Sequence, residues 1–216
     1  MMSNSPTVAY IGYGALARQI QQLLTEIQSP LASASSIFFD DYAYRDRVKC
    51  AYRFSDYLND QFKDCLFIVA IGYNHLPEKY EVIKQLKQRS RKLVSVLHPS
   101  SIISPCAKID DGVIIFSGCI IEMNSVISSG SILYNGCIVC HDSFIGQCSF
   151  LGPRVTIAGR TRVGDRTFLG IGTTVVNDID CGNDCCIGAS SLIQRSIPER
   201  TCGVGNPFHI TKNIRR

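Results

Sequence analysis

The sequence predicts a chain of two parts: an α/β N-terminal Rossmann-like subdomain with a short parallel sheet, over residues 1–98, and an all-β left-handed parallel β-helix of hexapeptide repeats, over residues 99–216. Two observations predict it. A glycine turn and alternating strand and helix patterns fill the first part, and an aliphatic residue recurs at every sixth position of the second. With 45% hydrophobic and 19% charged residues among 216, the composition is that of a globular chain.

Charge and composition argue against several classes of protein. Lys and Arg number 22 against 18 Asp and Glu, a net charge of +4 without a basic block, so we expect no nucleic-acid partner. No stretch approaches the roughly 18 apolar residues that a membrane span needs, so we expect none. The first residues, MMSNSPTVAYIGYG, lack the basic and apolar segments of a secretory signal, which predicts a cytoplasmic protein.

The 11 cysteines are expected to be reduced thiols in that compartment. Only Cys137 and Cys140 have the spacing of metal ligands. A second close pair is lacking, and the fold predicted below turns these two side chains in different directions. We therefore expect no metal site.

The first hundred residues follow the pattern of a parallel α/β unit. VAYI is predicted as a strand, a glycine turn follows, and the next segment has apolar residues at helical spacing: Leu16, Ile20, Leu23, Leu24 and Ile27. SIFFDDY is predicted as a second strand, CLFIVAIGYN as a third, and residues 78–91 as a second amphipathic helix.

The glycine turn is close to a dinucleotide-binding fingerprint. Gly12, Gly14 and Ala17 stand between the first strand and its helix, and Asp40 and Asp41 end the next strand, where an acid would hold a ribose. Three strands make half of a two-lobed dinucleotide fold, so a nucleotide or nucleotide sugar is favoured over a whole NAD. The alternative is that the glycines only make the turn and the aspartates only end the strand.

From residue 103 the chain repeats with a period of six. Fifteen of the sixteen positions from 103 to 193 are Ile, Leu or Val, and Cys181 is the exception. Four residues after each of them stands a small or β-branched residue, such as Ser125 or Thr161. A hexad is too short to include a helix, whereas a short strand and a tight corner fit six residues.

Three such strands close one triangular coil of 18 residues. The aliphatic position fills the prism and the small position fits where its walls converge. We expect glycines to follow at the corners: Gly146, Gly152, Gly164, Gly170, Gly182 and Gly188. The alternative, a β-sandwich, predicts turns every 8–12 residues without a fixed phase. The unbroken phase excludes it and predicts about five coils.

Residues 18 apart stack in the same column of a coiled prism. One outward column is apolar throughout: Ile114, Ile132, Phe150, Phe168 and Cys186. A long exposed apolar stripe is a liability for a monomer. We therefore expect this wall to pack against copies of the chain in a homotrimer.

His141 is the candidate general base. It is predicted to point outward from a corner, Asp142 follows it, and a carboxylate beside an imidazole raises its basicity. Gly159 stands one coil above, where a free backbone N–H could hold a carbonyl oxygen. The alternative, on these local features alone, is a surface histidine at a turn.

Four segments carry a resemblance to a known family: IFFDDY, FIVAIGYN, LHPSSIISPCA and VCHDSFIGQCSF. With the hexads, the small α/β domain and the closing Gly205-Asn-Pro207, the sequence resembles bacterial sugar O/N-acetyltransferases of the NeuD/PglD type. That family acetylates nucleotide-linked amino sugars or sialic acids with acetyl-CoA, and the resemblance covers nearly the whole chain.

The resemblance implies roles for particular residues. The residues matching His141 and Asp142 are the base and its acidic neighbour. Acetyl-CoA is held between subunits by residues matching Phe150, Gly159, Ile171 and Ala189. The nucleotide is held by residues matching Gly14, Ala15, Leu16, Asp40, Asp41 and Gly72. The family usually has a histidine where this chain has Leu16, and some members have a histidine where it has Phe150.

The function predicted is therefore acetyl-CoA-dependent N-acetylation of a nucleotide-linked deoxyamino sugar, by direct transfer, in the synthesis of a surface-glycan precursor. Acetyl-CoA is the co-substrate and the active sites of a homotrimer lie between subunits. One alternative is O-acetylation of a sialic-acid-like sugar. Another is a non-catalytic β-helical protein that binds a nucleotide sugar. The sequence does not distinguish UDP, dTDP, GDP or CMP.

Overall fold

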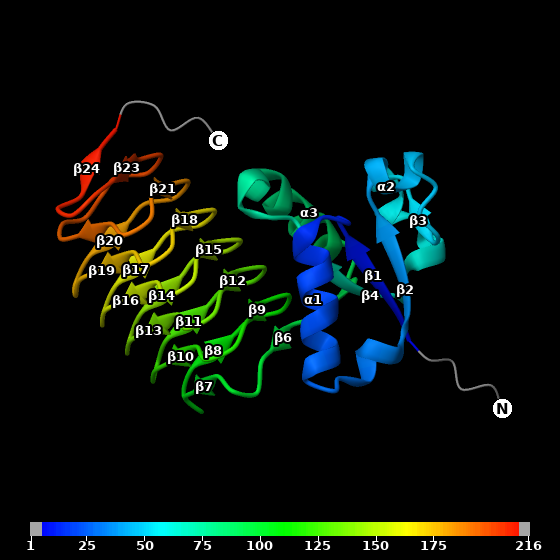
Figure 1. Ribbon diagram of the computed structural model, residues 1–216, viewed down its shortest axis with the longest axis horizontal. Helices are drawn as coiled ribbons and strands as arrows, with labels where there is room; N and C mark the ends of the chain where they lie inside the picture. Colours follow the sequence, from blue (N-terminus) through cyan, green and yellow to red (C-terminus); the bar gives the residue numbers. More distant parts are fainter. Residues whose placement is uncertain (1–5, 212–216) are drawn as a thin grey trace. The chain divides into compact units, whose positions relative to one another are not determined.

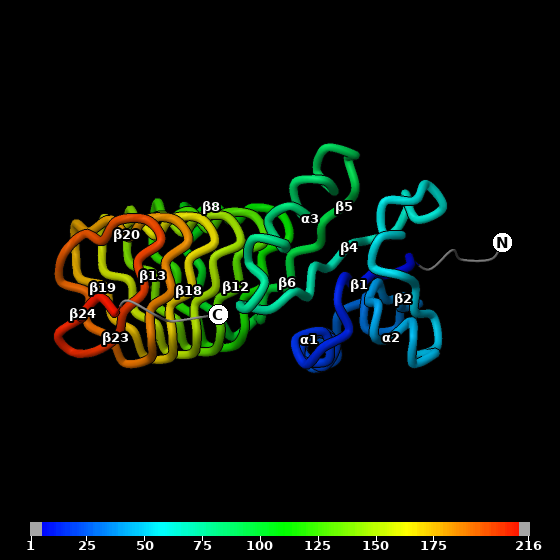
Figure 2. Tube along the Cα trace, turned by 90° about the horizontal axis from the view of Figure 1, so that it is seen from above, coloured from blue at the N-terminus to red at the C-terminus, as the bar shows by residue number. Residues whose placement is uncertain are grey.

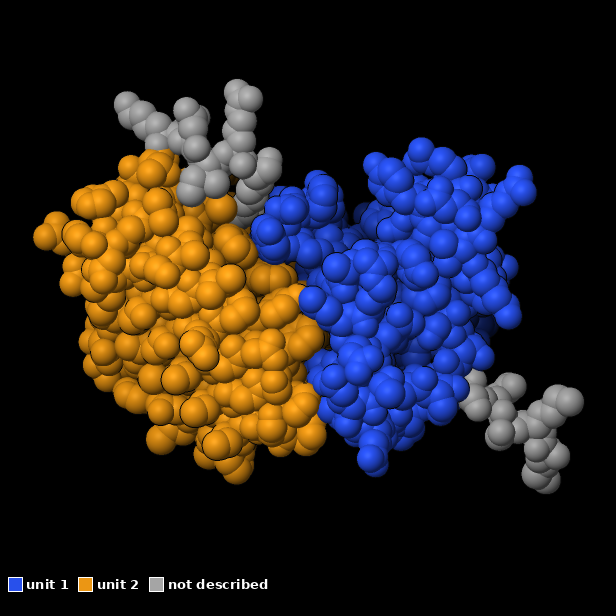
Figure 3. Space-filling model, viewed as in Figure 1, with its two compact units in different colours: residues 1–96 blue, residues 97–216 orange. Residues whose placement is uncertain are grey.

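A computed structural model describes residues 6–211. The chain divides into two compact units between Val96 and Leu97, so the described residues are 6–96 of the first unit and 97–211 of the second (Figure 3). No helix of the described residues is long and apolar enough to cross a membrane.

The first unit is a five-stranded parallel sheet flanked by helices (Figure 1). In the sheet the strand order is β3-β2-β1-β4-β5. Its strands are β1 (Thr7–Ile11), β2 (Ser35–Phe39), β3 (Ala51–Tyr52), β4 (Leu66–Val69) and β5 (Lys92–Leu93). The α-helices are α1 (Ala15–Glu26), α2 (Asp41–Arg45) and α3 (Leu76–Gln88), and 3₁₀ turns span Pro30–Ser33, Phe54–Leu58, Asp60–Phe62 and Tyr73–His75.

Most predicted elements of this unit are present. In α1, four of the five predicted apolar positions are buried: Leu16, Ile20, Leu23 and Leu24. Several features differ from the prediction. The third predicted strand, CLFIVAIGYN, ends at Val69, and its last two residues, Tyr73 and Asn74, lie in a 3₁₀ turn. Strands β3 and β5 complete a sheet of five rather than three, and the second predicted strand ends at Phe39, because the Asp40 side chain caps α2 by accepting from two backbone N–H groups.

The second unit is a left-handed β-helix, as the hexads predict. Sixteen two-residue strands, β7 to β22, recur every six residues, and each ends on the predicted aliphatic position. They are Ile102–Ile103, Lys108–Ile109, Ile114–Ile115, Ile120–Ile121, Val126–Ile127, Ile132–Leu133, Ile138–Val139, Phe144–Ile145, Phe150–Leu151, Thr156–Ile157, Arg162–Val163, Phe168–Leu169, Thr174–Val175, Asp180–Cys181, Cys186–Ile187 and Leu192–Ile193. The successive coils stack along the helix axis (Figure 2).

Three parallel sheets form the walls. One has six strands, β7, β10, β13, β16, β19 and β22, and is called here the threonine wall, because Thr156 and Thr174 lie on it. A five-stranded wall runs from β8 to β20. An eight-stranded wall runs from β6 (Val96–Leu97) through β9 and β21 to β23 (Cys202–Val204), on which β24 (His209–Ile210) folds back antiparallel.

The small inward position has a polar function as well as a steric one. Serine and threonine hydroxyls there donate to the carbonyl oxygen fifteen residues ahead, in the next coil. The Ser131 hydroxyl, for example, donates to the Gly146 carbonyl at 2.7 Å. These bonds satisfy the buried hydroxyls and tie neighbouring coils together.

The corner backbone differs from the expectation for glycine. A positive φ occurs at every sixth residue from 112 to 190, and most of these residues are not glycine. The predicted corner glycines stand two residues earlier in each hexad and have no positive φ. They are required by close approach, since a Cβ on Gly164 would lie 2.6 Å from the Asn183 backbone nitrogen.

The predicted apolar column lies on the eight-stranded wall. Ile114 and Ile132 are fully buried within the single chain, and Phe150 and Cys186 are buried too. This column is therefore not the exposed stripe that the sequence predicts. Three exposed apolar side chains lie at the threonine wall and its two edges: Ile102 (68% exposed), Ile171 (58%) and Met123 (54%). Others lie at the two ends of the eight-stranded wall: Leu97, Val204 and Ile210.

Candidate active site

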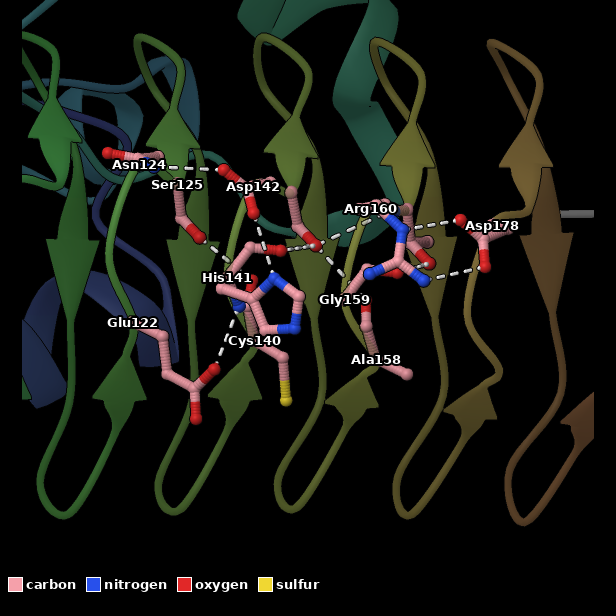
Figure 4. Close-up of polar contacts among 12 residues, drawn as sticks. Glu122, Asn124, Ser125, Cys140, His141, Asp142, Ala158, Gly159, Arg160 and Asp178 are labelled. Atoms are coloured by element: carbon pink, nitrogen blue, oxygen red, sulfur yellow. Dashed lines mark hydrogen bonds and ion pairs between the residues drawn. The ribbon is translucent and has the colours of Figure 1, made fainter.

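His141 lies at the corner that follows β13, where one hydrogen bond orients its imidazole and another holds its backbone (Figure 4). Nδ1 lies 2.8 Å from Asp142 Oδ2, and the two side chains are 40% and 46% exposed. The backbone N–H of His141 donates to Glu122 Oε2 at 2.8 Å. These contacts hold both the ring and the backbone that carries it.

The Asp142 carboxylate determines which ring nitrogen of His141 carries the proton. The Asn124 amide donates to Asp142 Oδ1 at 2.9 Å, and this bond and the imidazole hold the pKa of the Asp142 carboxyl below its usual range. A carboxylate only accepts hydrogen bonds, so Nδ1 of His141 carries the proton. The unprotonated Nε2 is then available to accept one from a substrate.

Gly159 lies directly against the imidazole. A Cβ added there would be 2.6 Å from Nε2 of His141, so only glycine leaves the ring in its place. Among the hydrogen bonds of residues 6–211, none uses the Gly159 N–H as donor. The predicted base and the predicted oxyanion donor are thus adjacent, with a free N–H between successive coils.

Cys140 precedes His141 and has a half-buried side chain. Burial, with the Glu122 carboxylate as a lesser cause, raises the pKa of the Cys140 thiol. The thiol is therefore held in its protonated, weakly nucleophilic form.

The other predicted acetyl-CoA residues lie elsewhere on the β-helix. Ile171 and Ala189 are exposed and occupy one corner in successive coils, at the opposite edge of the threonine wall from His141. Phe150 is buried on the eight-stranded wall. A single chain does not bring these three residues to the His141 corner.

The α/β unit has a cavity of about 300 Å³ where β1, β2 and β4 end. Its lining includes three of the predicted nucleotide residues, Gly14, Asp40 and Gly72. Ala15 begins α1, and the Leu16 side chain is buried. The carboxyl ends of parallel strands are where such sheets bind ligands.

The two aspartates are already engaged by the backbone. Asp40 accepts from the N–H groups of Tyr42 and Ala43 with Oδ1 and from that of Tyr13 with Oδ2. Asp41 accepts from the Phe54 N–H at 2.9 Å. Both carboxylates therefore shape the loops around the cavity.

Three further residues line this cavity and were not singled out in the sequence: Phe54, His75 and Glu78. His75 Nδ1 lies 3.8 Å from Glu78 Oε1, and both side chains are exposed. For His75 and Glu78 the only sequence signal is their place after the third predicted strand, whose carboxyl end meets the glycine turn. Phe54 precedes that strand and has no such signal.

A second cavity of this unit, of about 240 Å³, lies on the other side of Gly14 and Asp40 and is lined by Tyr13, Tyr42 and Asp46 among others. In the β-helix a cavity of about 330 Å³ lies at the last coil, and no predicted site residue lines it. Among the described residues no disulfide joins the cysteines, and no group of three or more His, Cys, Asp or Glu is placed to hold a metal.

No protein-family model matches the chain, and no curated protein matches it. Solved structures do match over its whole length. The GDP-perosamine N-acetyltransferase of Caulobacter crescentus, solved as a histidine-to-alanine variant with CoA and GDP-perosamine, has 25% identity and a TM-score of 0.83, covering 96% of this chain and 97% of its own. A second structure of the same enzyme, with the same two ligands, has 26% identity and a TM-score of 0.82, covering 95% and 97%.

The acetyltransferase domain of PglB from Neisseria gonorrhoeae, in complex with acetyl coenzyme A, has the same fold. Its identity is 21% and its TM-score 0.80, covering 96% of this chain and 100% of that domain. The predicted fold and family resemblance are confirmed: the structural neighbours are sugar acetyltransferases of the hexapeptide-repeat, left-handed β-helix family. The chain is thereby placed among the acetyltransferases of that class.

Proposed function

We propose that the protein transfers the acetyl group of acetyl-CoA directly to an amine of a nucleotide-linked deoxyamino sugar, as a cytoplasmic step in making a surface-glycan precursor. The observation that carries the proposal is the His141 imidazole, held by Asp142 through Nδ1 and lying with Nε2 over Gly159. The solved neighbours with 25–26% identity, which hold CoA and an amino sugar linked to GDP, support the substrate class.

The mechanism follows from the proton positions. Nε2 of His141 takes a proton from the substrate amine as its nitrogen attacks the thioester carbonyl, and Asp142 stabilises the imidazolium that forms. The Gly159 N–H donates to the oxyanion of the tetrahedral intermediate. When the C–S bond breaks, the imidazolium returns the proton to the CoA thiolate.

No acyl-enzyme is needed for this reaction. Acetyl-CoA is an activated thioester, and a positioned general base contributes about 10² to 10⁴ in rate. The nearest thiol, Cys140, has a raised pKa because it is buried, which disfavours it as an acetyl acceptor. Direct transfer in a ternary complex agrees with both facts.

The nucleotide is assigned to the α/β unit. The cavity at Gly14 and Gly72 leads to the first turn of α1, whose backbone N–H groups favour a diphosphate. Ala15 and Leu16 would contribute backbone there, because the Leu16 side chain is buried. Since Asp40 and Asp41 hold backbone groups, the exposed carboxylate of Glu78 is the group left to accept from a nucleobase.

Assembly as a homotrimer would complete the site. The threonine wall has exposed apolar residues at both edges, Met123 on the His141 corner and Ile171 on the other. Apposing this wall to a second copy buries those side chains. It also brings the corner of Ile171 and Ala189 from one subunit to the His141 corner of the next, where acetyl-CoA would lie.

The test is turnover with defined substrates. Acetyl-CoA is incubated with deoxyamino sugars linked to GDP, UDP, dTDP or CMP, and thiol release and the mass of the sugar product are followed. We expect one nucleotide series to gain a single acetyl group on nitrogen. Turnover of hydroxyl acceptors alone would favour O-acetylation, and nucleotide-sugar binding without thiol release would favour a non-catalytic protein.

A further inference from the structure

We propose that Asn124 and Asp178 are positioning residues for the His141–Asp142 pair: Asn124 directs one oxygen of Asp142 at the imidazole, and Asp178 keeps the Arg160 guanidinium away from it. The inference rests on the proposed role of His141 as the base. It concerns a column of four side chains on the corner beside that histidine (Figure 4).

The four residues occupy equivalent places in successive coils. Asn124, Asp142, Arg160 and Asp178 are each 18 residues apart, and all have a positive φ, between 55° and 61°. Stacked parallel strands repeat the backbone from coil to coil, so their side chains leave the corner in the same direction. Each can therefore contact the residue in the coil on either side.

Asn124 engages only one oxygen of Asp142. Its Nδ2 donates to Oδ1 at 2.9 Å, and Oδ2 lies 2.8 Å from Nδ1 of His141. Because each carboxylate oxygen has its own donor, the carboxylate plane is fixed and Oδ2 remains with the imidazole. A carboxylate without the amide could rotate or share both oxygens with solvent.

Arg160 has a carboxylate in the coil on each side of it, Asp142 and Asp178. It pairs with Asp178 in a bidentate manner, with Nε–Oδ1 at 2.7 Å and Nη2–Oδ2 at 2.9 Å. If Asp178 did not hold it, the guanidinium could bind Asp142, which would withdraw that carboxylate from His141. Because Arg160 pairs with Asp178, the Asp142 carboxylate remains hydrogen-bonded to His141.

A second column shows the same pair without a histidine. Arg166 and Asp184 bind each other at 2.8 Å through both pairs of atoms, one hexad further along the chain. That pair provides a matched control. Breaking it removes a bidentate contact between the same two coils, on a different corner of the prism.

Four other charged or titratable groups lie around His141. Glu122 accepts its backbone N–H from the coil below, Cys140 precedes it, and Arg160 and Asp178 lie in the two coils above. Of these, Arg160 and Asp178 act on Asp142 or on the imidazole through their charge. Changing the column should thus move the titration of the imidazole in a direction set by the sign of the change.

The experiment measures the pH profile of kcat and, independently of turnover, the NMR titration of the His141 imidazole in four variants. Asn124→Gly tolerates the positive φ and removes the amide, so kcat should fall several-fold with KM unchanged. Asn124→Asp adds a carboxylate, so the titration midpoint should rise by about half a unit. Asp178→Asn releases Arg160 toward Asp142, so the midpoint should fall and kcat should drop about tenfold.

The control variant Asp184→Asn should lower the melting temperature, as Asp178→Asn does. Unlike Asp178→Asn, it should keep the wild-type titration of the His141 imidazole and the wild-type kcat. Wild-type titrations in the Asn124 and Asp178 variants, or shifts in the same direction for Asn124→Asp and Asp178→Asn, would overturn the proposal. The proposed function fails separately, if the wild-type protein transfers no acetyl group. In that case the NMR titration still decides the roles of Asn124 and Asp178.

Discussion

Gly159 is the residue on which the position of the His141 imidazole depends. Gly159→Ala places a Cβ 2.6 Å from Nε2, and the ring must move because it is the flexible partner. We expect the protein to keep its melting temperature and nucleotide affinity while kcat falls about tenfold or more. Asn177→Ala, at the same corner position one coil further, is the control, and a fully active Gly159→Ala would contradict the assignment of the site.

Cys140 tests whether the acetyl group passes through the enzyme. Its raised pKa keeps the thiol protonated at neutral pH, since the charged form is disfavoured by burial and by Glu122. Cys140→Ala should therefore retain kcat within about threefold and leave no acetylated protein in a rapid quench analysed by mass spectrometry. Complete loss of turnover in a folded Cys140→Ala would favour an acyl-enzyme instead.

The sequence was enough to predict part of the site, because the residues involved are neighbours in the chain or lie one coil apart. His141 and Asp142 are neighbours, and 18-residue spacing places Gly159 above them. That arithmetic also lines up Asn124, Asp142, Arg160 and Asp178. It does not say which neighbour each side chain binds, because Arg160 has an acid on both sides and rotamers decide between them.

At the scale of elements, the hexad separates two kinds of glycine. Gly164 follows a strand and faces the backbone of the next coil, whereas Gly118 has a φ of +69°, and a Cβ there would lie 4.0 Å from its nearest neighbour, the Gly136 nitrogen. Gly164→Ala should lower the free energy of unfolding by about 1 to 3 kcal/mol, because backbone atoms must move. Gly118→Asn should cost about 1 kcal/mol or less, since asparagine tolerates a positive φ.

Urea denaturation of both variants measures this difference. Equal losses of stability would show that close approach is not what requires glycine after the strands. The control is internal to the chain, because Asn124 already occupies the same hexad position with a φ of +60°.

The sequence did not predict β3 and β5, because these strands form through pairing with other strands and not through a pattern of their own. The strands of the β-helix repeat with a fixed phase, so the pattern itself identifies them. In contrast, β3 and β5 have two residues each and exist because β2 and β4 offer free edges. Asp40 and Asp41 end the second strand in the prediction and follow it in the structure, and only the fold shows that they bind backbone N–H groups of Tyr13 and Phe54.

In the assembled protein, we expect the threonine wall to be the surface that joins the subunits. Thr156→Arg places a charge on the threonine wall, so we expect monomers in light scattering and loss of acetyl transfer. Arg162→Glu, on the five-stranded wall, is the control and should leave the mass unchanged. Ile132→Glu tests something else, because Ile132 is fully buried in the single chain and a charge there should prevent folding.

The proposed function divides the chemistry between the two units. It assigns nucleotide affinity to the cavity of the α/β unit and acetyl transfer to the His141 corner of the β-helix. A trimer with the wrong wall would leave Ile171 and Ala189 away from His141. A Thr156→Arg variant that is trimeric and fully active would therefore refute the proposed interface without affecting the assignment of the base.

The central claim is that His141 is the general base of direct acetyl transfer. Its side chain is 40% exposed and supports no core contact, so His141→Ala should fold normally. The most direct measurement is single-turnover acetylation of the nucleotide-linked amine by this variant, with the affinities for acetyl-CoA and for the sugar measured by calorimetry. We expect unchanged affinities and a rate lower by about 10² to 10⁴, whereas a rate within a few-fold of the wild type would contradict the role of His141 as the base.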